Sequence, residues 1–382
     1  MKSSYFLIFI SIVSIVYFSL HYYLYIRAMQ VFSFPVGIKK YISIAYILLS
    51  SFFIIGMFLQ HSYSSLLSDI IYKIGAIWLV FFLYFLLTVV FIDCIRLLDY
   101  FFHFLPAYSS FQKTVLGSVV VGVVALTVLI GHINAKSIRI NNINLQINKQ
   151  IEGNKTLTIL MVSDVHLGAV IGEKGEKKLL QIVEEQQPDL VLLCGDIIDG
   201  NIANVRRKNL GKHLQQMKAP LGVFAVSGNH EYIDNIELAI DFLENCNIKV
   251  LQDQAITLSN GIQIIGRKDR QSKYSINDTP PLPLKNLISN LDTARPIIVM
   301  KHQPNQLNEA AKNAVDLHLS GHTHHGQLWP INYITQSLFE VSYGYKKINN
   351  THFYVSSGFG TWGPNVRIGN RPEVVLFTIE FQ

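Results

Sequence analysis

The chain has 382 residues, enough for two folding units, and a formal net charge of +6 at pH 7. Residues 1–135 hold seven Lys or Arg against three Asp or Glu, so four of the six surplus charges lie beside hydrophobic segments, which argues against a nucleic-acid-binding patch. The three cysteines, Cys94, Cys194 and Cys246, are too few and too scattered for a disulfide framework or a cysteine metal site.

Four long apolar stretches fill most of the first 135 residues, and each is about as long as a helix that crosses a bilayer. They are approximately residues 4–26, 41–60, 72–92 and 114–133. The first is longer than a signal-peptide core and has no small-residue cleavage site before Arg27, so we expect it to remain in the protein. We therefore predict a membrane domain with four transmembrane helices over 1–135 and a soluble domain over 136–382.

The basic residues between these stretches predict the orientation of a multi-pass integral membrane protein, because short loops rich in Lys and Arg stay in the cytoplasm. The first loop holds Arg27, Lys39 and Lys40 and the third holds Arg96 and Lys113, against Lys73 alone beside the second. This distribution favours an extracytoplasmic soluble domain. Three basic residues oppose it, because they would then also lie outside: Lys2, Lys136 and Arg139.

Short β-rich runs alternate with amphipathic stretches from residue 157 onward, a pattern typical of α/β layers. We predict strands at 157–163, 190–194, 222–226, 262–266, 296–300, 315–320, 352–357 and 373–379. We predict helices at 174–186, 204–217, 234–245 and 304–313.

Polar residues follow nearly every predicted strand. They are Asp164 and His166, Asp196 and Asp199, Asn229 and His230, His302, and His322 and His324. Because strand ends on one edge of an open α/β sheet converge, we expect these side chains to meet. In two pairs, Asp164 with His166 and His322 with His324, the members are two residues apart, so extended backbone would turn both toward one cavity.

Aspartate, histidine and asparagine together form a mixed oxygen and nitrogen shell, which suits manganese, iron or zinc better than a thiolate site or an all-oxygen calcium site does. Gly195, Gly228 and Gly321 each stand directly before a candidate ligand. Glycine permits the tight turns that a close approach of backbone and ion requires. The sequence therefore predicts a metal site.

The ordered motifs D-x-H, GDxxD, GNHE, an isolated His and GHTH, at about residues 160 to 325, resemble the signature of the calcineurin-like metallophosphoesterases. The run GHTHHGQLWP and the segment from Ser356 to Ile379 are similar to a bacterial subgroup of membrane-associated phosphoesterases. The resemblance implies a layered α/β/β/α sandwich after the transmembrane region, and a place in the bacterial inner or plasma membrane.

By motif position, the resemblance implies two divalent metal ions. Asp164, His166, Asp196 and His324 would hold one, and Asp196, Asn229, His302 and His322 the other. Asp196 would bridge the two ions, and a hydroxide that they activate would attack phosphorus in line. His230 resembles the family's general acid for the leaving alkoxide, and Asp199 the carboxylate that orients it.

Other features have less specific interpretations. The run GFGTWG at 358–363 matches a dinucleotide-binding pattern, but Pro364 and the extended sequence beyond it deny the glycines a helix, so we predict a turn near the mouth of the site. Arg367 is a candidate substrate-binding residue that contacts phosphate, with a surface ion pair as the alternative. We expect His325 to face away from the ligands and Glu231 to cap the next helix.

The expected activity is hydrolysis of a phosphoester or pyrophosphate bond near the bilayer, and the resemblance implies a lipid-linked compound such as UDP-2,3-diacylglucosamine as one candidate substrate. One alternative is a generic nucleotide or phosphodiester phosphodiesterase. Another is a membrane receptor or transporter with a regulatory phosphoesterase module. The expected partners are the phosphoester substrate and the lipid bilayer, without nucleic acid.

Overall fold

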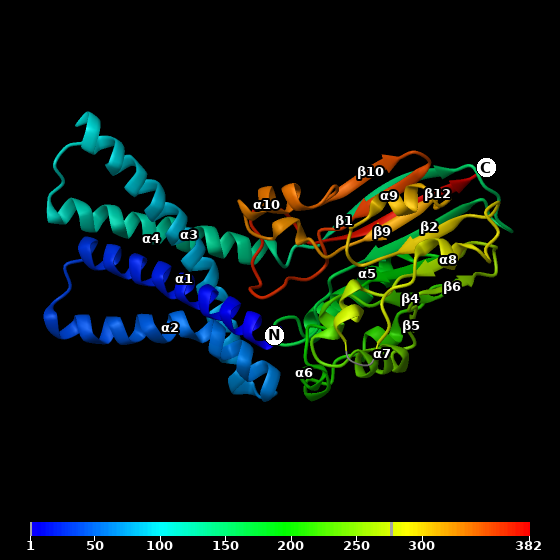
Figure 1. The fold of residues 1–382 in the computed structure, drawn as a ribbon, viewed down its shortest axis with the longest axis horizontal. Helices are drawn as coiled ribbons and strands as arrows, with labels where there is room; N and C mark the ends of the chain where they lie inside the picture. Colours follow the sequence, from blue (N-terminus) through cyan, green and yellow to red (C-terminus); the bar gives the residue numbers. More distant parts are fainter. Residues whose placement is uncertain (1, 276–277) are drawn as a thin grey trace. The chain divides into compact units, whose positions relative to one another are not determined.

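The computed structural model describes residues 2–275 and 278–382. In the first helix it describes the side chain of Ile8 and those from Ile10 onward. The chain divides into two compact units. Met1–Leu59 and Leu67–Gly131 form one unit, which we call the helical unit. Gln60–Leu66 and His132–Gln382 form the other, which we call the sheet unit. Figure 1 shows both along the chain.

The helical unit is built on four helices, α1 (Lys2–Val31), α2 (Val36–Ser62), α3 (Leu66–Phe102) and α4 (Ser110–Asn134). Among the described residues, three of them, α2, α3 and α4, are long and apolar enough to cross a membrane. Three of the four predicted spanning helices are therefore candidate spans by length and composition. The described side chains of α1 include His21, Arg27 and several tyrosines, which lower its hydropathy.

Polar contacts link α1 to α3 within this unit. Arg27 forms an ion pair with Asp93 at 2.7 Å, and the hydroxyl of Tyr23 donates a hydrogen bond to the same carboxylate. Gly75 of α3 lies directly against the backbone of α2, because an added Cβ would meet the nitrogen of Phe53 at 2.2 Å. Small residues at such crossings allow close packing of membrane helices.

The sheet unit contains two six-stranded sheets (Figure 1). The first has the strand order β1-β12-β2-β3-β4-β5, with β1 (Arg139–Ile147), β12 (Glu373–Phe381), β2 (Thr156–Val162), β3 (Leu190–Cys194), β4 (Val223–Val226) and β5 (Lys249–Val250). The second has the order β10-β11-β9-β8-β7-β6, with β10 (Gly344–Ile348), β11 (Thr351–Val355), β9 (Leu317–Ser320), β8 (Ile297–Met300), β7 (Gln263–Gly266) and β6 (Gln254–Thr257).

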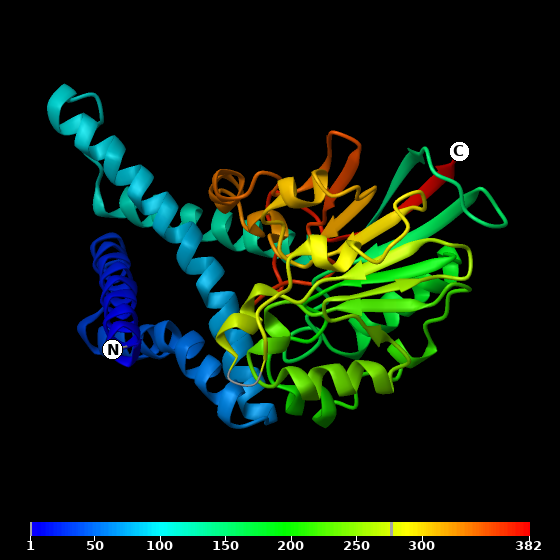
Figure 2. The ribbon, with the colours of Figure 1, turned by 45° about the vertical axis from the view of Figure 1, so that its right-hand side comes forward.

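Successive side chains of each strand point to opposite faces of the sheet, so each sheet packs against a layer on either side. Ile159 and Met161 of β2 face a core that they share with Ile298 and Leu319 of the second sheet, whereas Leu160 faces the opposite way. On that outer side lie α5 (Glu173–Gln186), α6 (Ile202–Arg207) and α7 (Ile236–Asn245), and the second sheet is covered by α8 (Leu284–Ile288) and α9 (Leu307–Ala311). Figure 2 shows the paired sheets and their helices from a second side. The predicted mixed α/β class is confirmed.

All eight predicted strands are present, with ends within two residues of the predicted ones. Two predicted helices are shorter than expected. In 204–217 regular helix ends at Arg207, shortly before the positive φ of 50° at Asn209, and in 304–313 the positive φ of 60° at Gln306 delays the start of helix to Leu307. The strands β1, β5, β6 and β10 and the helices α8 and α10 (Ile331–Leu338) were not predicted. The polar residues in β1 and β10, which lie at the edges of the two sheets, hide the strand pattern there.

Candidate metal centre

Each group of candidate ligands lies in the loop that follows a buried apolar strand, so the end of the strand fixes the position of the ligands. Asp164 and His166 follow β2, Asp196 follows β3, Asn229 follows β4, His302 follows β8, and His322 and His324 follow β9. The strands β2, β3 and β4 are parallel, and so are β8 and β9, so the loops of each sheet leave it at one edge.

The backbone at this edge turns sharply instead of continuing as strand. The φ angles of Asp164, His166, Asp196, His322 and His324 are 55°, 53°, 51°, 73° and 45°. Non-glycine residues seldom adopt this left-handed region, and such strain is concentrated at functional sites. The prediction that the two ligand pairs lie in extended backbone is therefore wrong, because tight turns present these side chains.

Two of the glycines that precede candidate ligands allow the close approach. A Cβ added to Gly228 would lie 2.1 Å from Oδ1 of Asp196, and one added to Gly321 would lie 2.3 Å from Oδ2 of Asp164. Any side chain at these positions would displace a carboxylate, so the lack of space requires glycine at both.

The first group of side chains consists of Asp164, His166 and His324, whose candidate ligand atoms all lie within 4.8 Å of one another. The Nε2 atoms of the two histidines are 3.0 Å apart, and Nε2 of His324 is 3.4 Å from Oδ1 of Asp164. Burial lowers the pKa of His324, and the neighbouring His166 and Arg367 lower it further. The imidazole of His324 is therefore neutral and can offer a lone pair to a cation.

The second group consists of Asp196, His302 and His322, also within 4.8 Å. Nδ1 of His302 donates to the carbonyl oxygen of Cys194 at 2.9 Å, which turns Nε2 toward Oδ2 of Asp196 at 3.0 Å. Burial disfavours the imidazolium form of His302, but Asp196 raises the pKa of His302 well above its usual value. A cation between these two side chains would replace that proton. Burial lowers the pKa of His322 to about 3.

Asp196 faces both groups. Its Oδ1 accepts the backbone N–H of His230 at 2.8 Å, and its Oδ2 lies 3.0 Å from Nε2 of His302 and 3.9 Å from Nε2 of His166. Among the described residues, Oδ1 of Asn229 is buried without a hydrogen-bond partner. An unpaired buried amide oxygen beside imidazole nitrogens and a carboxylate fits a divalent metal ion.

His230 and Asp199 form a pair beside both groups. Nδ1 of His230 lies 2.8 Å from Oδ1 of Asp199, which leaves Nε2 on the side of Asp196 at 3.9 Å from Oδ2. Burial opposes the charge on His230, but Asp196 and then Asp199 raise the pKa of His230 to about 9. Burial likewise opposes the charge on Asp199, yet hydrogen bonds from His166 and His230 hold the pKa of Asp199 below its usual value.

Residues 157–326, which carry all of these side chains, match the family model of the calcineurin-like phosphoesterases. The chain is also 35% identical over 263 residues to a metallophosphoesterase from Aquifex aeolicus, an alignment that covers 67% of this chain and 98% of that protein. The chain belongs to the calcineurin-like metallophosphoesterase family. Membership of this family confirms the resemblance based on the sequence motifs. The protein is therefore a hydrolase that acts on phosphoesters.

Two further relatives connect the metallophosphoesterase to membranes and to other bacteria. A transmembrane protein with a metallophosphoesterase domain from Danio rerio is 28% identical over 286 residues, covering 72% of this chain and 64% of that protein. A metallophosphoesterase from Helicobacter pylori strain J99 is 32% identical over 215 residues, covering 56% and 57% of the two chains. With its three apolar helices, this metallophosphoesterase is a membrane protein.

Glu231 has a structural role that the sequence did not reveal. Its buried carboxylate accepts hydrogen bonds from the backbone N–H groups of Asp196, Ile197, Ile198 and Gly228 at 2.7 to 3.1 Å. It does not cap the next helix, where the side chain of Asn235 serves instead. A glutamate directly after the GNH run is the sequence signal for this contact.

Arg367 lies elsewhere than predicted. Its side chain is fully buried, and its guanidinium donates to the carbonyl oxygens of Ser357 at 2.7 Å and Gly358 at 3.1 Å. It also lies 3.2 Å from Nδ1 of His324. The prediction of a phosphate contact or a surface ion pair is corrected, because this arginine holds the glycine-rich turn against the loop that carries His324.

The GFGTWG run is a turn, as predicted, and no helix follows it in the described residues up to β12. Gly360 packs so closely that an added Cβ would lie 2.3 Å from the carbonyl oxygen of Val165. The run therefore supports the D-x-H loop and does not bind a dinucleotide in the way its pattern suggested.

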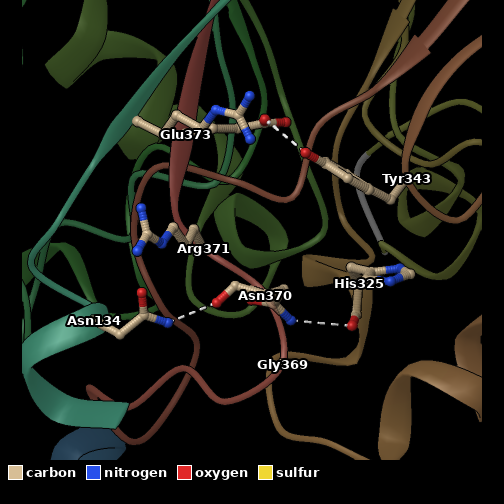
Figure 3. Close-up of a pocket in the computed structure, with 8 residues that line it drawn as sticks. Asn134, His325, Tyr343, Gly369, Asn370, Arg371 and Glu373 are labelled. Atoms are coloured by element: carbon tan, nitrogen blue, oxygen red, sulfur yellow. Dashed lines mark hydrogen bonds between the residues drawn. The ribbon is translucent and has the colours of Figure 1, made fainter. Parts of the chain in front are cut away.

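His325 points into a separate cavity of about 460 Å³. Its lining also includes Asn134, Arg139, Tyr343, Gly369, Asn370, Arg371 and Glu373 (Figure 3). The amide of Asn370 donates to the carbonyl oxygens of His324 and His325, both at 3.1 Å, so this cavity adjoins the loop of the metal centre.

Proposed function

We propose that the sheet unit hydrolyses a phosphoester or pyrophosphate bond with two divalent metal ions. One ion is held by Asp164, His166, Asp196 and His324, and the other by Asp196, Asn229, His302 and His322. The observation that carries this assignment is the position of Oδ2 of Asp196, which faces His302 on one side and His166 on the other. A carboxylate in that position suits a bridge between two cations.

Bound ions supply Lewis-acid stabilisation of the phosphoryl charge and an activated water at neutral pH. The side chains of the protein position the substrate and move the proton of the leaving group. Nδ1 of His230 lies on Asp199, which leaves Nε2 on the side of the metal ligands to carry the proton for the leaving group. We assign His230 as the general acid that protonates the leaving alkoxide, and Asp199 as the carboxylate that orients it.

The proposed substrates are phosphoesters and pyrophosphates as a class. Nucleotide and other phosphodiesters are the first compounds to test, followed by lipid-linked compounds such as UDP-2,3-diacylglucosamine. Manganese, iron and zinc are the candidate metals, because the donors are imidazole nitrogens and carboxylate or amide oxygens.

We further propose that residues 1–135 form the membrane domain, with α1 as a fourth spanning helix, and that residues 136–382 form the catalytic domain. The loop charges favour an extracytoplasmic catalytic domain in a bacterial inner or plasma membrane. Fusions of alkaline phosphatase and of a fluorescent protein to the C-terminus test the side. An active phosphatase fusion is expected, and a fluorescent, phosphatase-inactive pair would place the domain in the cytoplasm.

The activity is tested on the full-length protein in neutral detergent with bis(p-nitrophenyl) phosphate. Hydrolysis should require added manganese, iron or zinc and stop with a chelator. Asp196→Asn should lower the bound metal from about two ions per chain to one or none and reduce turnover by at least about 10³-fold, because each ion loses a ligand. Full metal content and turnover in Asp196→Asn would contradict the bridging assignment. Asp241→Asn, in the exposed part of α7, is the matched control.

A further inference from the structure

The sheet unit has one region where large apolar side chains face solvent together. Among the described residues after Gly131, seven of the twelve exposed large apolar side chains lie from Trp329 to Trp362. Five of them surround or belong to α10, namely Trp329, Tyr333, Ile334, Leu338 and Trp362, with exposed fractions between 48% and 71%. We call these five the α10 surface.

Helix α10 has no buried residue, unlike α5 and α7, which bury an apolar face on the first sheet. Ile331, Ile334 and Leu338 stand at i, i+3 and i+7, so they share one face of the helix. The stretch from Gly321 to Phe339 contains no Asp, Glu, Lys or Arg, and neither does the stretch from Thr351 to Val366. An amphipathic helix of this kind requires a partner for its apolar face.

Hydrogen bonds connect the two loops that carry the tryptophans of the α10 surface. The side chain of Gln327 donates to the carbonyl oxygen of Trp362 at 2.9 Å and accepts its N–H at 3.0 Å. The N–H of Trp329 donates to the carbonyl oxygen of Ile368 at 2.8 Å. The two tryptophan loops are therefore held together although they are 33 residues apart in the chain.

The same loops are tied to the end of a candidate membrane span. The last turn of α4 belongs to the sheet unit, and there Nδ1 of His132 lies 2.7 Å from the carbonyl oxygen of Asn365. The amide of Asn134, the final residue of α4, donates to the carbonyl oxygens of Arg367 at 2.9 Å and Asn370 at 2.7 Å. The end of a spanning helix lies at the level of the lipid headgroups, where tryptophan and tyrosine are enriched.

Two arginines near the α10 surface carry positive charge that is complementary to the phosphate groups of phospholipids. Arg139 and Arg371 line the cavity shown in Figure 3, and neither guanidinium has a hydrogen bond or ion pair within residues 2–275 and 278–382. The third ionic residue of the cavity, Glu373, is buried and already accepts from Tyr343, Tyr354 and the N–H of Ser357, each at 3.1 Å. Free guanidiniums beside an apolar surface suit lipid phosphates.

We propose that the α10 surface inserts into the headgroup layer of the bilayer, with Arg139 and Arg371 on lipid phosphates. The catalytic unit then lies directly on the membrane instead of being suspended from it by α4 alone. Phe339 directly follows α10, and its ring lies 5.9 Å from the ring of the candidate ligand His322. Contact with lipid is thus adjacent to the loop of the metal centre.

The test uses the three tryptophans of the full-length protein, Trp78 in α3 and Trp329 and Trp362 in the α10 surface. Trp78→Phe leaves the two surface tryptophans as the emitters. In nanodiscs of phosphatidylcholine and phosphatidylglycerol, lipids brominated near the headgroup should quench their emission about twofold or more, with blue-shifted spectra. A protein that keeps Trp78 but carries Trp329→Phe and Trp362→Phe reports that reconstitution succeeded.

A charge-insertion pair makes the result specific to α10. Ile334→Glu with Leu338→Glu should reduce the quenching, and because both side chains are exposed, folding should be retained. Leu238→Glu, also exposed but on α7, should leave the quenching unchanged. Red-shifted emission quenched by iodide and not by bromolipid would overturn the proposal. Emission quenched by neither would also overturn it, because a protein surface would then cover α10.

Discussion

Nδ1 of His230 lies 2.8 Å from Oδ1 of Asp199, and the same carboxylate oxygen lies 3.5 Å from Nδ1 of His166. One carboxylate thus contacts both the candidate general acid and a candidate metal ligand. This arrangement fixes the Nδ1 tautomer of His230 and leaves Nε2 toward the site. It also means that changes at position 199 would affect metal binding, so the acid is best tested at position 230.

His230→Ala should leave metal content intact and reduce turnover of substrates with poor leaving groups by about 10²-fold or more. Nitrophenyl esters should lose much less, because nitrophenolate leaves without a proton. The comparison is the ratio of kcat values for a methyl and a nitrophenyl phosphodiester. Equal losses for both esters would remove His230 from the role of general acid.

Glu231→Gln should weaken metal binding by about 10- to 100-fold, because the carboxylate orders the loop that carries Asp196. An amide NH₂ at this position would face several backbone N–H groups, and the free energy of unfolding should fall by about 1–3 kcal/mol. Metal titration and chemical denaturation measure the two effects. Glu237→Gln, exposed in the first turn of α7, is the control, and unchanged metal affinity in Glu231→Gln would refute the positioning role.

Arg367→Gln should destabilise the protein by about 2–4 kcal/mol, because a buried guanidinium that donates to several carbonyl oxygens leaves them unpaired when it is removed. Thermal unfolding of the full-length protein measures the loss, with the exposed Arg206→Gln as control. A raised KM without loss of stability would instead restore Arg367 as a substrate contact.

Burial lowers the pKa of His318 in β9 to about 3, against about 6.5 in the unfolded chain. Between pH 6.5 and 3 the unfolded state binds more protons, so the folded state loses up to about 1.4 kcal/mol for each pH unit of acidification. His318→Leu should therefore flatten the acid limb of the stability curve by that amount. Parallel curves for the two proteins, measured by denaturation from pH 7 to 5 at constant metal, would exclude the histidine as a cause.

The family and the mixed α/β class could be predicted from sequence because the motifs are local. Runs such as GDIID and GNHE place a turn and its polar residues within five positions, directly after a buried strand. The candidate ligands could be named for the same reason. Long apolar stretches likewise indicate membrane helices, since a bilayer selects for length and composition.

Tertiary structure alone decided what those residues contact. The edge strand β1 carries many polar residues and pairs with β12, which lies near the far end of the chain, so its sequence alone did not identify it as a strand. The burial of Arg367, the four backbone N–H groups on Glu231 and the separation of His322 from His324 all depend on loops that meet across two sheets. A sequence lists the donors and acceptors, but only packing brings them within the roughly 3 Å at which a hydrogen bond or a metal ligand acts.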